Sequence, residues 1–398
     1  MDRRQARVRL ESTVEQSRIT ILHGLPRVGR SALLAVWCDD QVGVQRVRPA
    51  EVAACSAPLQ VIDHLGGAEV DVFIGSFREI EASRRSRYVI APLDLAATRQ
   101  LQEALPGSVQ IVDLDPLQRH EVLADEFEIA EPFTAEVEPL ASPVASNRPM
   151  FDLDQHWLRG GLPESLEAEN DLASLKWRQQ MIDALLLRDY SRWGLSPGLK
   201  IGDMLTWVAG QNGGEFDLDN PSIGKRADVR SALHVLERLG VVRQLRNYPL
   251  RSEVSLARKP KIHIRDSGLL HAVLGIETIE QLRAHSLMGE SWEGYAIETL
   301  IHAANRPDTA QFYREPGPDG ADEIDLVLDF RPWNGRLVAV ECKVGPETPP
   351  RPGFYRAMTA IGATDGFVVH SGSGPQTDLK TPRLDLATAR ARIIELAS

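Results

Sequence analysis

Short apolar runs alternate with amphipathic stretches over the first third of the chain. Between residues 18 and 112 the apolar runs are rich in β-branched residues, and the stretches that separate them have helical spacing. Alternation of this kind predicts an α/β domain built on a parallel sheet. The strands expected on this basis are 19–22, 70–74, 88–90 and 109–112.

The pattern changes twice further along the chain. From 151 to about 276 the apolar residues recur at spacings of three and four, which predicts helices such as 181–187 and 229–239. Near Leu287 a third pattern begins, with a helix over 292–304, two alternating strands on either side of Asn334-Gly335, and a closing β/α stretch. We therefore expect a multidomain α/β chain.

Composition narrows the class of protein. The chain has 398 residues, 43% of them apolar, which excludes a collagen-like or wholly disordered protein, and its net charge of −11 excludes a uniformly cationic nucleic-acid binder. The three cysteines (Cys38, Cys55 and Cys342) form no CxxC pair, so neither a disulfide framework nor a zinc site is expected. No export signal or membrane-spanning run is apparent, and we expect a soluble, cytoplasmic protein without a membrane partner.

Charge is distributed unevenly and suggests domain boundaries. Residues 113–138 carry nine acids against one base and lead into loop-like sequence near residue 150. Residues 225–265 carry eleven Lys or Arg against three acids, a local balance of +8. We divide the chain into domains at 1–150, 151–280 and 281–398.

The segment Gly24-Leu-Pro-Arg-Val-Gly29-Arg30-Ser31 has the layout of a phosphate-binding loop. It lies between a predicted strand and a predicted helix, so its backbone N–H groups can surround a phosphate while Ser31 offers its hydroxyl to Mg²⁺. Position 30 is arginine where the pattern has lysine, and the bulkier guanidinium fits the phosphates differently. We expect Gly24, Gly29, Arg30 and Ser31 to bind ATP, with hydrolysis weak or lost.

A second feature of the nucleotide site is also incomplete. The apolar run at 59–62 ends in Asp63, which could assist Mg²⁺, but His64 stands where a general base is expected. The alternative is that Asp63 only marks an ordinary strand end.

The basic middle segment favours a helix-turn-helix with a β-wing. Helical units are expected at 201–210, 220–225 and 227–239, followed by strand-like sequence at 241–245. Cations on the third helix and the wing could contact DNA phosphates; these are Lys225, Arg226, Arg230, Arg243, Arg246 and Arg251. The alternative is a solvated basic face on a protein-interaction module.

The third constellation of charged residues lies near the carboxyl end. On a strand, Glu341 and Lys343 share a face, and Asp325 comes from the preceding strand. Asp325 and Glu341 could hold Mg²⁺, Lys343 could orient a water for phosphodiester cleavage, and Glu293 on the preceding helix is a fourth member. The alternative is an exposed acid and base pair on the wet face of a strand.

Strand register decides whether these groups meet. A tight turn at Asn334-Gly335 would put Asp325 on the wrong face, so we predict a one-residue bulge around Pro332 or another odd-length connection.

Taken together, these segments resemble the prokaryotic AAA-type ATPases that carry a C-terminal restriction-endonuclease-like domain of unknown function. The similarity runs nearly end to end. It rests on the following segments: 24–31, Asp115-Pro-Leu-Gln-Arg-His-Glu121, Gly160-Gly-Leu-Pro-Glu164, Leu187-Arg-Asp189, Lys259-Pro-Lys-Ile-His-Ile-Arg-Asp266-Ser-Gly-Leu269, Gly289-Glu-Ser-Trp-Glu293, Glu323-Ile-Asp325 and Glu341-Cys-Lys343.

The resemblance implies a P-loop AAA-like domain, a winged helix, and a PD-(D/E)XK nuclease-like fold whose metal and catalytic positions map to Glu293, Asp325, Glu341 and Lys343. The departures are Arg30, the Asp63-His64 pair, and Ala91-Pro92 where a polar sensor is expected. The leading hypothesis is a DNA-associated protein with a degenerate nucleotide site and a metal-dependent nuclease-like domain. Two alternatives are a non-catalytic, nucleotide-responsive regulator or scaffold that binds DNA, and an active DNA-stimulated ATPase.

Overall fold

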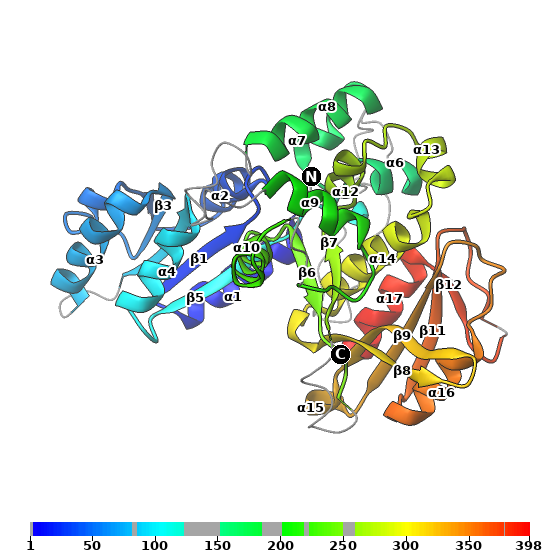
Figure 1. The fold of residues 1–398 in the computed structure, drawn as a ribbon. Helices are drawn as coiled ribbons and strands as arrows, with labels where there is room; N and C mark the ends of the chain where they lie inside the picture. The colour runs from blue at the N-terminus through cyan, green and yellow to red at the C-terminus, as the bar shows by residue number, and fades with distance from the viewer. Residues whose placement is uncertain are drawn as a thin grey trace, which may run out of the picture. The chain divides into compact units, whose positions relative to one another are not determined.

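The computed structural model describes residues 3–81, 86–122, 152–184, 201–218, 223–249, 259–377 and 379–398. The chain folds into two compact units, Met1–His156 with Gly161–Pro163, and Trp157–Gly160 with Glu164–Ser398. Both units are mixed α/β (Figure 1). Several predicted features fall outside the described residues: the boundary near residue 150, most of the acidic stretch 113–138, the Leu187–Asp189 motif, and Arg251.

The first unit is built on a five-stranded parallel sheet. Its strand order is β2-β3-β4-β1-β5, and every neighbouring pair is parallel. The strands are β1 (Ile19–Gly24), β2 (Val44–Arg46), β3 (Leu59–Leu65), β4 (Arg87–Pro92) and β5 (Val109–Leu114). The expected parallel sheet is therefore present.

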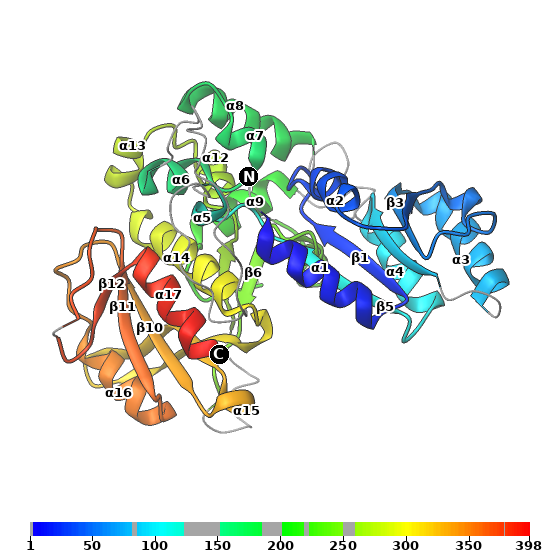
Figure 2. The same ribbon diagram turned by 180° about the vertical axis from the view of Figure 1, so that it is seen from behind.

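The first unit also contains helices. They are α1 (Arg4–Gln16), α2 (Arg30–Asp39), α3 (Gly67–Glu81), α4 (Leu95–Ala104) and α5 (Arg119–Val122), with a short 3₁₀ helix, η1 (Pro49–Glu51). One core joins the sheet to α3 and α4, whereas α1 contacts β1, β4 and β5 and lies across them in Figure 2.

The strand predicted at 70–74 is wrong, because these residues lie within α3. Val70, Phe73, Ile74 and Phe77 are all buried, which is the three-and-four spacing of a helix face. A five-residue window matched alternation by chance, and only the longer window shows the helical period.

The second unit begins with helices and a two-stranded antiparallel sheet. The elements are α8 (Asp171–Ile182), α9 (Ile201–Gly210), α10 (Arg226–Arg238), β6 (Val242–Leu245), β7 (Lys261–Ile264), α12 (Ser267–Leu274) and α13 (Ile279–Ala284); α6 (Leu153–Arg159) and α7 (Pro163–Leu166) are divided between the units. In the sheet, Val242 lies opposite Ile264. The helix expected at 220–225 falls partly outside the described residues, and its described part, 223–225, is not helical. The winged helix therefore stays a prediction.

The second unit ends in a mixed five-stranded sheet of order β12-β11-β10-β9-β8. Its strands are β8 (Ala310–Gly317), β9 (Gly320–Asp329), β10 (Leu337–Lys343), β11 (Asp365–His370) and β12 (Arg383–Asp385). The helices around it are α14 (Met288–Ala304), α15 (Arg331–Asn334), α16 (Pro352–Ile361) and α17 (Leu386–Ala397), with a short 3₁₀ helix, η4 (Pro307–Thr309). Helix α16 packs on β8 and β9, and α14 contacts both β10 and α17.

The connection between β9 and β10 differs from a tight hairpin. Leu337 lies opposite Asp329, so the connection spans residues 330–336 and contains the short helix α15. The prediction of an odd-length connection is confirmed. The tight turn confined to Asn334-Gly335, which would put Asp325 on the wrong face, does not form, because Pro332 at the start of α15 favours a helical turn.

Of the helices in the described ranges, none combines the length and apolar character needed to cross a membrane.

Candidate functional site

Pro332 lies in α15 and the pairing of β9 with β10 is regular, so the one-residue bulge expected there is not present; a different bulge interrupts the pairing of β8 with β9 at Asp325. Gln311 pairs with Val327 and Tyr313 with Ile324, so two residues of β9, Asp325 and Leu326, lie opposite a single residue of β8. A bulge bends its strand locally and redirects side chains. Asp325 is thus the residue at which β9 departs from regular pairing.

Asp325 and Glu341 lie on neighbouring strands. Val340 pairs with Leu326, and continuing this register puts Asp325 opposite Glu341. Oδ2 of Asp325 accepts a hydrogen bond of 2.8 Å from the backbone N–H of Cys342. Asp325 is 8% exposed and Glu341 is 5% exposed, so both carboxyl groups are largely removed from water.

Lys343 completes the group predicted on β10. Its Nζ is 2.5 Å from Oε1 of Glu341. Burial raises the pKa of Glu341, the carboxylate of Asp325 adds to the rise, and Lys343 opposes it, which leaves the pKa of Glu341 at about 8. Burial by itself lowers the pKa of Lys343, but the neighbouring Glu341 outweighs this effect and raises that pKa above its usual value. Lys343 therefore stays protonated at neutral pH.

The ammonium of Lys261 reaches the same cluster from the first residue of β7. Its Nζ is 2.8 Å from Oε1 of Glu323, 3.0 Å from Oε1 of Glu293 and 3.4 Å from Oδ1 of Asp325. The side chain is 3% exposed, and Nζ lies 5.7 Å from the centre of the Phe312 ring. Burial by itself lowers the pKa of Lys261, but the three carboxylates outweigh it and hold that pKa well above its usual value.

Glu293 is the member of the cluster that α14 supplies. Burial raises its pKa, Asp325 adds to the rise, and Lys261 opposes it, which gives a pKa of about 8. Glu323 is the outermost carboxylate, and Nε of Arg314 is 3.9 Å from its second oxygen. We call Glu293, Glu323, Asp325, Glu341, Lys261 and Lys343 the carboxylate–lysine cluster.

His263 borders this cluster. Its side chain is fully buried, and neither ring nitrogen has a hydrogen-bond partner among the described residues. Nε2 lies 3.9 Å from Oε1 of Glu293. Burial lowers the pKa of His263 to about 3, so its imidazole is neutral at physiological pH.

The donor set of the cluster suits a hard divalent cation. Glu293, Asp325 and Glu341 offer carboxylate oxygens, which are the ligands that Mg²⁺ and Mn²⁺ prefer. In the present arrangement Glu293 and Asp325 face the ammonium of Lys261, which is itself a cation. Within the part of the chain that the structure describes, no group of three or more His, Cys, Asp or Glu side chains is arranged to hold a metal ion.

In the first unit, two glycines set the backbone path of the loop after β1. Gly24 and Gly29 have φ of 154° and 99°, and a Cβ on Gly24 would lie 2.5 Å from the carbonyl oxygen of Leu114. In chain order, β1 is followed by β2 at one edge of the sheet, whereas its neighbour β4 is followed by β5 at the other edge. Ligands of parallel sheets bind at the carboxyl ends of such strands.

The side chains around the loop are arranged differently from a standard nucleotide site. NH1 of Arg30 donates a hydrogen bond of 2.7 Å to the carbonyl of Pro92, at the end of β4. Burial lowers the pKa of Arg30 although Asp63 opposes it. Oγ of Ser31 donates to Oδ1 of Asp63 at 3.2 Å and lies 3.4 Å from Nε2 of His64. The structure thus brings Ser31 and Asp63 together and directs Arg30 to the end of β4.

The predicted DNA-contact residues divide into two groups. Lys225, Arg226 and Arg230 on α10, and Arg246 after β6, are exposed. Arg243 is bound to Glu298, with NH2 to Oε2 at 3.0 Å, and Nε of Arg265 is 3.0 Å from the same oxygen. Arg243 thus shares a largely buried carboxylate of α14 with Arg265, and its contact with DNA stays a prediction.

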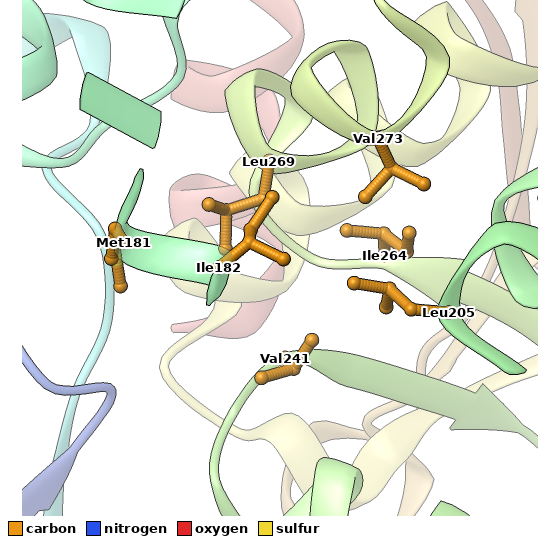
Figure 3. A pocket seen from close by; sticks show the side chains of 7 residues that line it. All are labelled: Met181, Ile182, Leu205, Val241, Ile264, Leu269 and Val273. Carbon is orange, nitrogen blue, oxygen red and sulfur yellow. The ribbon is translucent and has the colours of Figure 1, made fainter. Parts of the chain in front are cut away.

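A small pocket in the second unit is a different kind of cavity. Figure 3 shows its lining, which is aliphatic apart from one thioether: Met181, Ile182, Leu205, Val241, Ile264, Leu269 and Val273. Because no charged or hydrogen-bonding side chain lines it, the pocket offers no group for acid–base or metal chemistry.

Comparison with known proteins adds little about function. Residues 150–280 match a domain of unknown function, DUF8612. Two uncharacterized proteins, one of Mycobacterium bovis and one of Mycobacterium tuberculosis, are each 27% identical to the chain over 344 residues, covering 84% of this chain and 73% of theirs.

Two solved structures are weakly similar. A Walker-type ATPase of Pyrococcus abyssi is 12% identical, with a TM-score of 0.41, over 69% of this chain and 95% of that one. Can2 of Sulfobacillus thermosulfidooxidans, in complex with cyclic tetra-adenylate, is 12% identical, with a TM-score of 0.21, over 96% of this chain and 99% of that one. At these TM-scores neither similarity bears on the function of the chain.

Sequence reasoning did not identify three members or neighbours of the cluster. Glu323 lies two residues before Asp325, and this strand spacing could have revealed it. Lys261 and His263 share the same spacing on β7, but Lys261 and Asp325 are 64 positions apart in the chain. No local pattern predicts a contact of that separation, and the basic surroundings of Lys261 favoured a phosphate contact.

Proposed function

We propose that the second unit hydrolyses phosphodiester bonds of DNA in a reaction that depends on a divalent metal ion. The observation that supports this most is the convergence of Asp325, Glu341 and Lys343, which come from adjacent strands, beside Glu293 of α14. Buried carboxylates with raised pKa values are costly to the fold, and they are more common at functional sites than elsewhere.

Asp325, Glu341 and Glu293 would hold the metal ion. A bound Mg²⁺ or Mn²⁺ supplies Lewis-acid polarisation of a phosphate oxygen and makes a nucleophilic water available at neutral pH. Lys343, which stays protonated beside Glu341, donates a hydrogen bond to the attacking water or to the phosphate. In the reaction, the water oxygen forms a new P–O bond as the bond to the leaving oxygen breaks. The attacking water gives up its proton to solvent, and the leaving oxygen takes up a proton from solvent.

DNA is the expected substrate because of α10. Exposed Lys225, Arg226 and Arg230 lie in its first two turns, in the same unit as the cluster. Cations on one helix turn contact phosphates without reading sequence. We expect backbone contacts to dominate binding.

Nicking of supercoiled plasmid tests this function. With Mg²⁺ or Mn²⁺ the wild-type chain should nick the plasmid and EDTA should stop it, whereas Lys343→Ala and Asp325→Asn should lower the rate about a hundredfold or more. Lys176→Ala, an exposed lysine on α8, is the matched control and should nick at the wild-type rate. Equal rates for Lys343→Ala and wild type would refute the assignment.

We further propose that the first unit binds a nucleotide without hydrolysing it appreciably. The hydrogen bond between Ser31 and Asp63 joins the hydroxyl and the carboxylate that a Mg²⁺-nucleotide would need, which supports binding. Arg30 is directed to Pro92, and no described lysine takes its place in the loop, which supports loss of turnover.

Calorimetric titration with Mg²⁺-ATP tests the nucleotide site. Ser31→Ala should weaken binding, and Arg30→Lys should strengthen it because the ammonium is released from the end of β4. Arg99→Lys, at an exposed position of α4, is the control and should bind like wild type. Rapid ATP hydrolysis by the wild-type chain, with or without DNA, would contradict the proposal and favour a DNA-stimulated ATPase.

A further inference from the structure

Lys261 lies where the carboxylates of two elements converge. Its ammonium is within 3.4 Å of oxygens from Glu293, Glu323 and Asp325, and it is almost completely buried. An ammonium can donate three hydrogen bonds, so three carboxylate oxygens match its capacity. Lys261 thus pairs with Glu293 and Asp325, two of the three carboxylates that would hold a metal ion.

A second observation indicates that this region is built for a ligand. His263, two residues along β7, is fully buried with both ring nitrogens unpaired among the described residues, and its Nε2 is directed toward Glu293. Buried imidazole nitrogens normally find a partner, because an unsatisfied polar atom is costly. The ring nitrogens of His263 are therefore available to donate or accept a hydrogen bond beside Glu293 and Lys261.

We propose that the Lys261 ammonium is a built-in counter-ion which a divalent metal must displace to occupy the carboxylate–lysine cluster. This inference rests on the proposed function, because it uses the same carboxylates as the metal site. A flexible side chain of four methylene groups can move its charge without moving β7. Lys261 thereby stabilises the cluster when no metal is bound and lowers its affinity for metal.

The competition follows from electrostatics. A divalent ion bound by Glu293 and Asp325 would compete with the ammonium for the same two carboxylates, and like charges repel strongly where water is excluded. Lys261 lies on the hairpin that follows α10, the helix with the exposed cations. Contacts that shift this hairpin would change the metal affinity of the cluster.

Titration of the full chain with Mn²⁺ alone, followed by calorimetry, tests the proposal. Lys261→Met should bind Mn²⁺ on the order of tenfold more tightly than wild type, or more. Adding Asp325→Asn to Lys261→Met should abolish the gain and so locate it in this cluster. Lys259→Met is the matched control, because it changes the net charge by the same amount as Lys261→Met. Lys259 is exposed and pairs with Asp217 outside the cluster, so its loss should leave the Mn²⁺ affinity unchanged.

Loss of Lys261 also leaves three carboxylates without their counter-ion, so the variant is expected to be less stable. Thermal unfolding gives a second readout: Mn²⁺ should raise the midpoint of Lys261→Met more than that of wild type. If the single variant does not fold, Glu323→Gln and the double variant Lys261→Met/Glu323→Gln replace the pair, since one carboxylate fewer reduces the repulsion. The double variant should then bind Mn²⁺ more tightly than Glu323→Gln.

The outcomes separate the two proposals. Equal Mn²⁺ affinity in wild type and Lys261→Met would overturn the competition and leave the proposed function standing. Equal gains in Lys261→Met and Lys259→Met would also overturn it, because the effect would then be long-range charge. No Mn²⁺ binding in any variant would overturn both, whereas a gain confined to Lys261→Met, without plasmid nicking, would support the competition and refute the hydrolysis.

Discussion

Three of the buried histidines in the described part of the chain have strongly lowered pKa values. Burial lowers the pKa of His156 to about 4 and those of His263 and His271 to about 3. Their ordinary pKa is 6.5, so below that pH these histidines bind protons in the unfolded chain but stay unprotonated in the folded chain. Each histidine therefore contributes stability above pH 6.5 that is progressively lost as the pH falls toward 3.

His271 provides the clearest test of this effect. Its Nδ1 is 2.9 Å from the carbonyl of Leu158 and its Nε2 is 2.7 Å from Oγ of Ser291. When the pH falls from 7.5 to 5.0, His271 should lower the free energy of unfolding of the wild type by about 2 kcal/mol. His271→Gln should be less stable at pH 7.5 but lose less on acidification. Urea unfolding at several pH values measures this, and exposed His234→Gln should keep the wild-type slope.

At the scale of single residues, the sequence predicted part of the cluster. Asp325, Glu341 and Lys343 were expected together, because a strand has a period of two and the odd-length connection aligns β9 with β10. The role of Lys261 was missed, because the pairing of β7 with the cluster depends on tertiary structure. The pairing of Arg243 with Glu298 was not foreseen for the same reason, because the two residues lie 55 positions apart.

Helix α12 and the backbone of α6 approach each other closely. A Cβ on Gly268 would lie 2.1 Å from the carbonyl oxygen of Arg159. Arg178, which is fully buried, donates hydrogen bonds to the carbonyls of Leu158 and Gly268, at 3.1 and 2.6 Å. The close approach thus depends on the absence of a side chain at Gly268 and on Arg178, which donates hydrogen bonds to carbonyl groups of both helices.

Gly268→Ala should destabilise the second unit. The added methyl group meets backbone atoms that cannot move independently, so we expect a loss of about 1–3 kcal/mol. Gly289→Ala is the control, because Gly289 lies in α14 with no atom within 4 Å of its Cβ position. It should be neutral or slightly stabilising. Denaturant midpoints compare the two, and equal midpoints would contradict the close approach.

Helix α10 should carry the salt dependence of DNA binding. Arg230→Ala removes an exposed cation that we propose contacts a phosphate, so it should weaken binding and reduce the salt slope by about 1. Arg243→Gln should leave the slope unchanged, because Arg243 is bound to Glu298. Fluorescence anisotropy at several salt concentrations measures both. A slope that falls equally in the two variants would show that Arg243 also reaches DNA.

Elements with long, regular patterns were the ones predicted well. Helix α10 and helix α14 agree with the expected helices at 229–239 and 292–304. The wrong strand at 70–74 comes from a short window. Over five residues, helical and strand periods cannot be distinguished, and burial against α4 and the sheet decides the outcome for α3.

At the scale of the whole molecule, the chain has separate hydrophobic cores. One core contains Phe73 and belongs to the first unit, and another contains Phe354 and belongs to the second. Each phenylalanine is at most 1% exposed. We infer that the two units unfold as separate cooperative transitions.

Differential scanning calorimetry of two variants tests this inference. Phe73→Ala and Phe354→Ala should each cost about 3–5 kcal/mol in the unit that contains it. Each variant should therefore lower the temperature of one transition and leave the other in place. A single transition that both variants shift equally would contradict independent unfolding.

The bulge at Asp325 and Leu326 makes the acidic group sensitive to a change of one residue in the length of β9. Deleting the codon for Leu326 would let β9 pair regularly with β8, but Asp325 would then lie opposite Val340 and on the other side of the sheet from Glu341. The strands would remain paired while the acidic group came apart. One in-frame deletion or insertion at this point is thus enough for a lineage to discard or regain the site without losing the architecture.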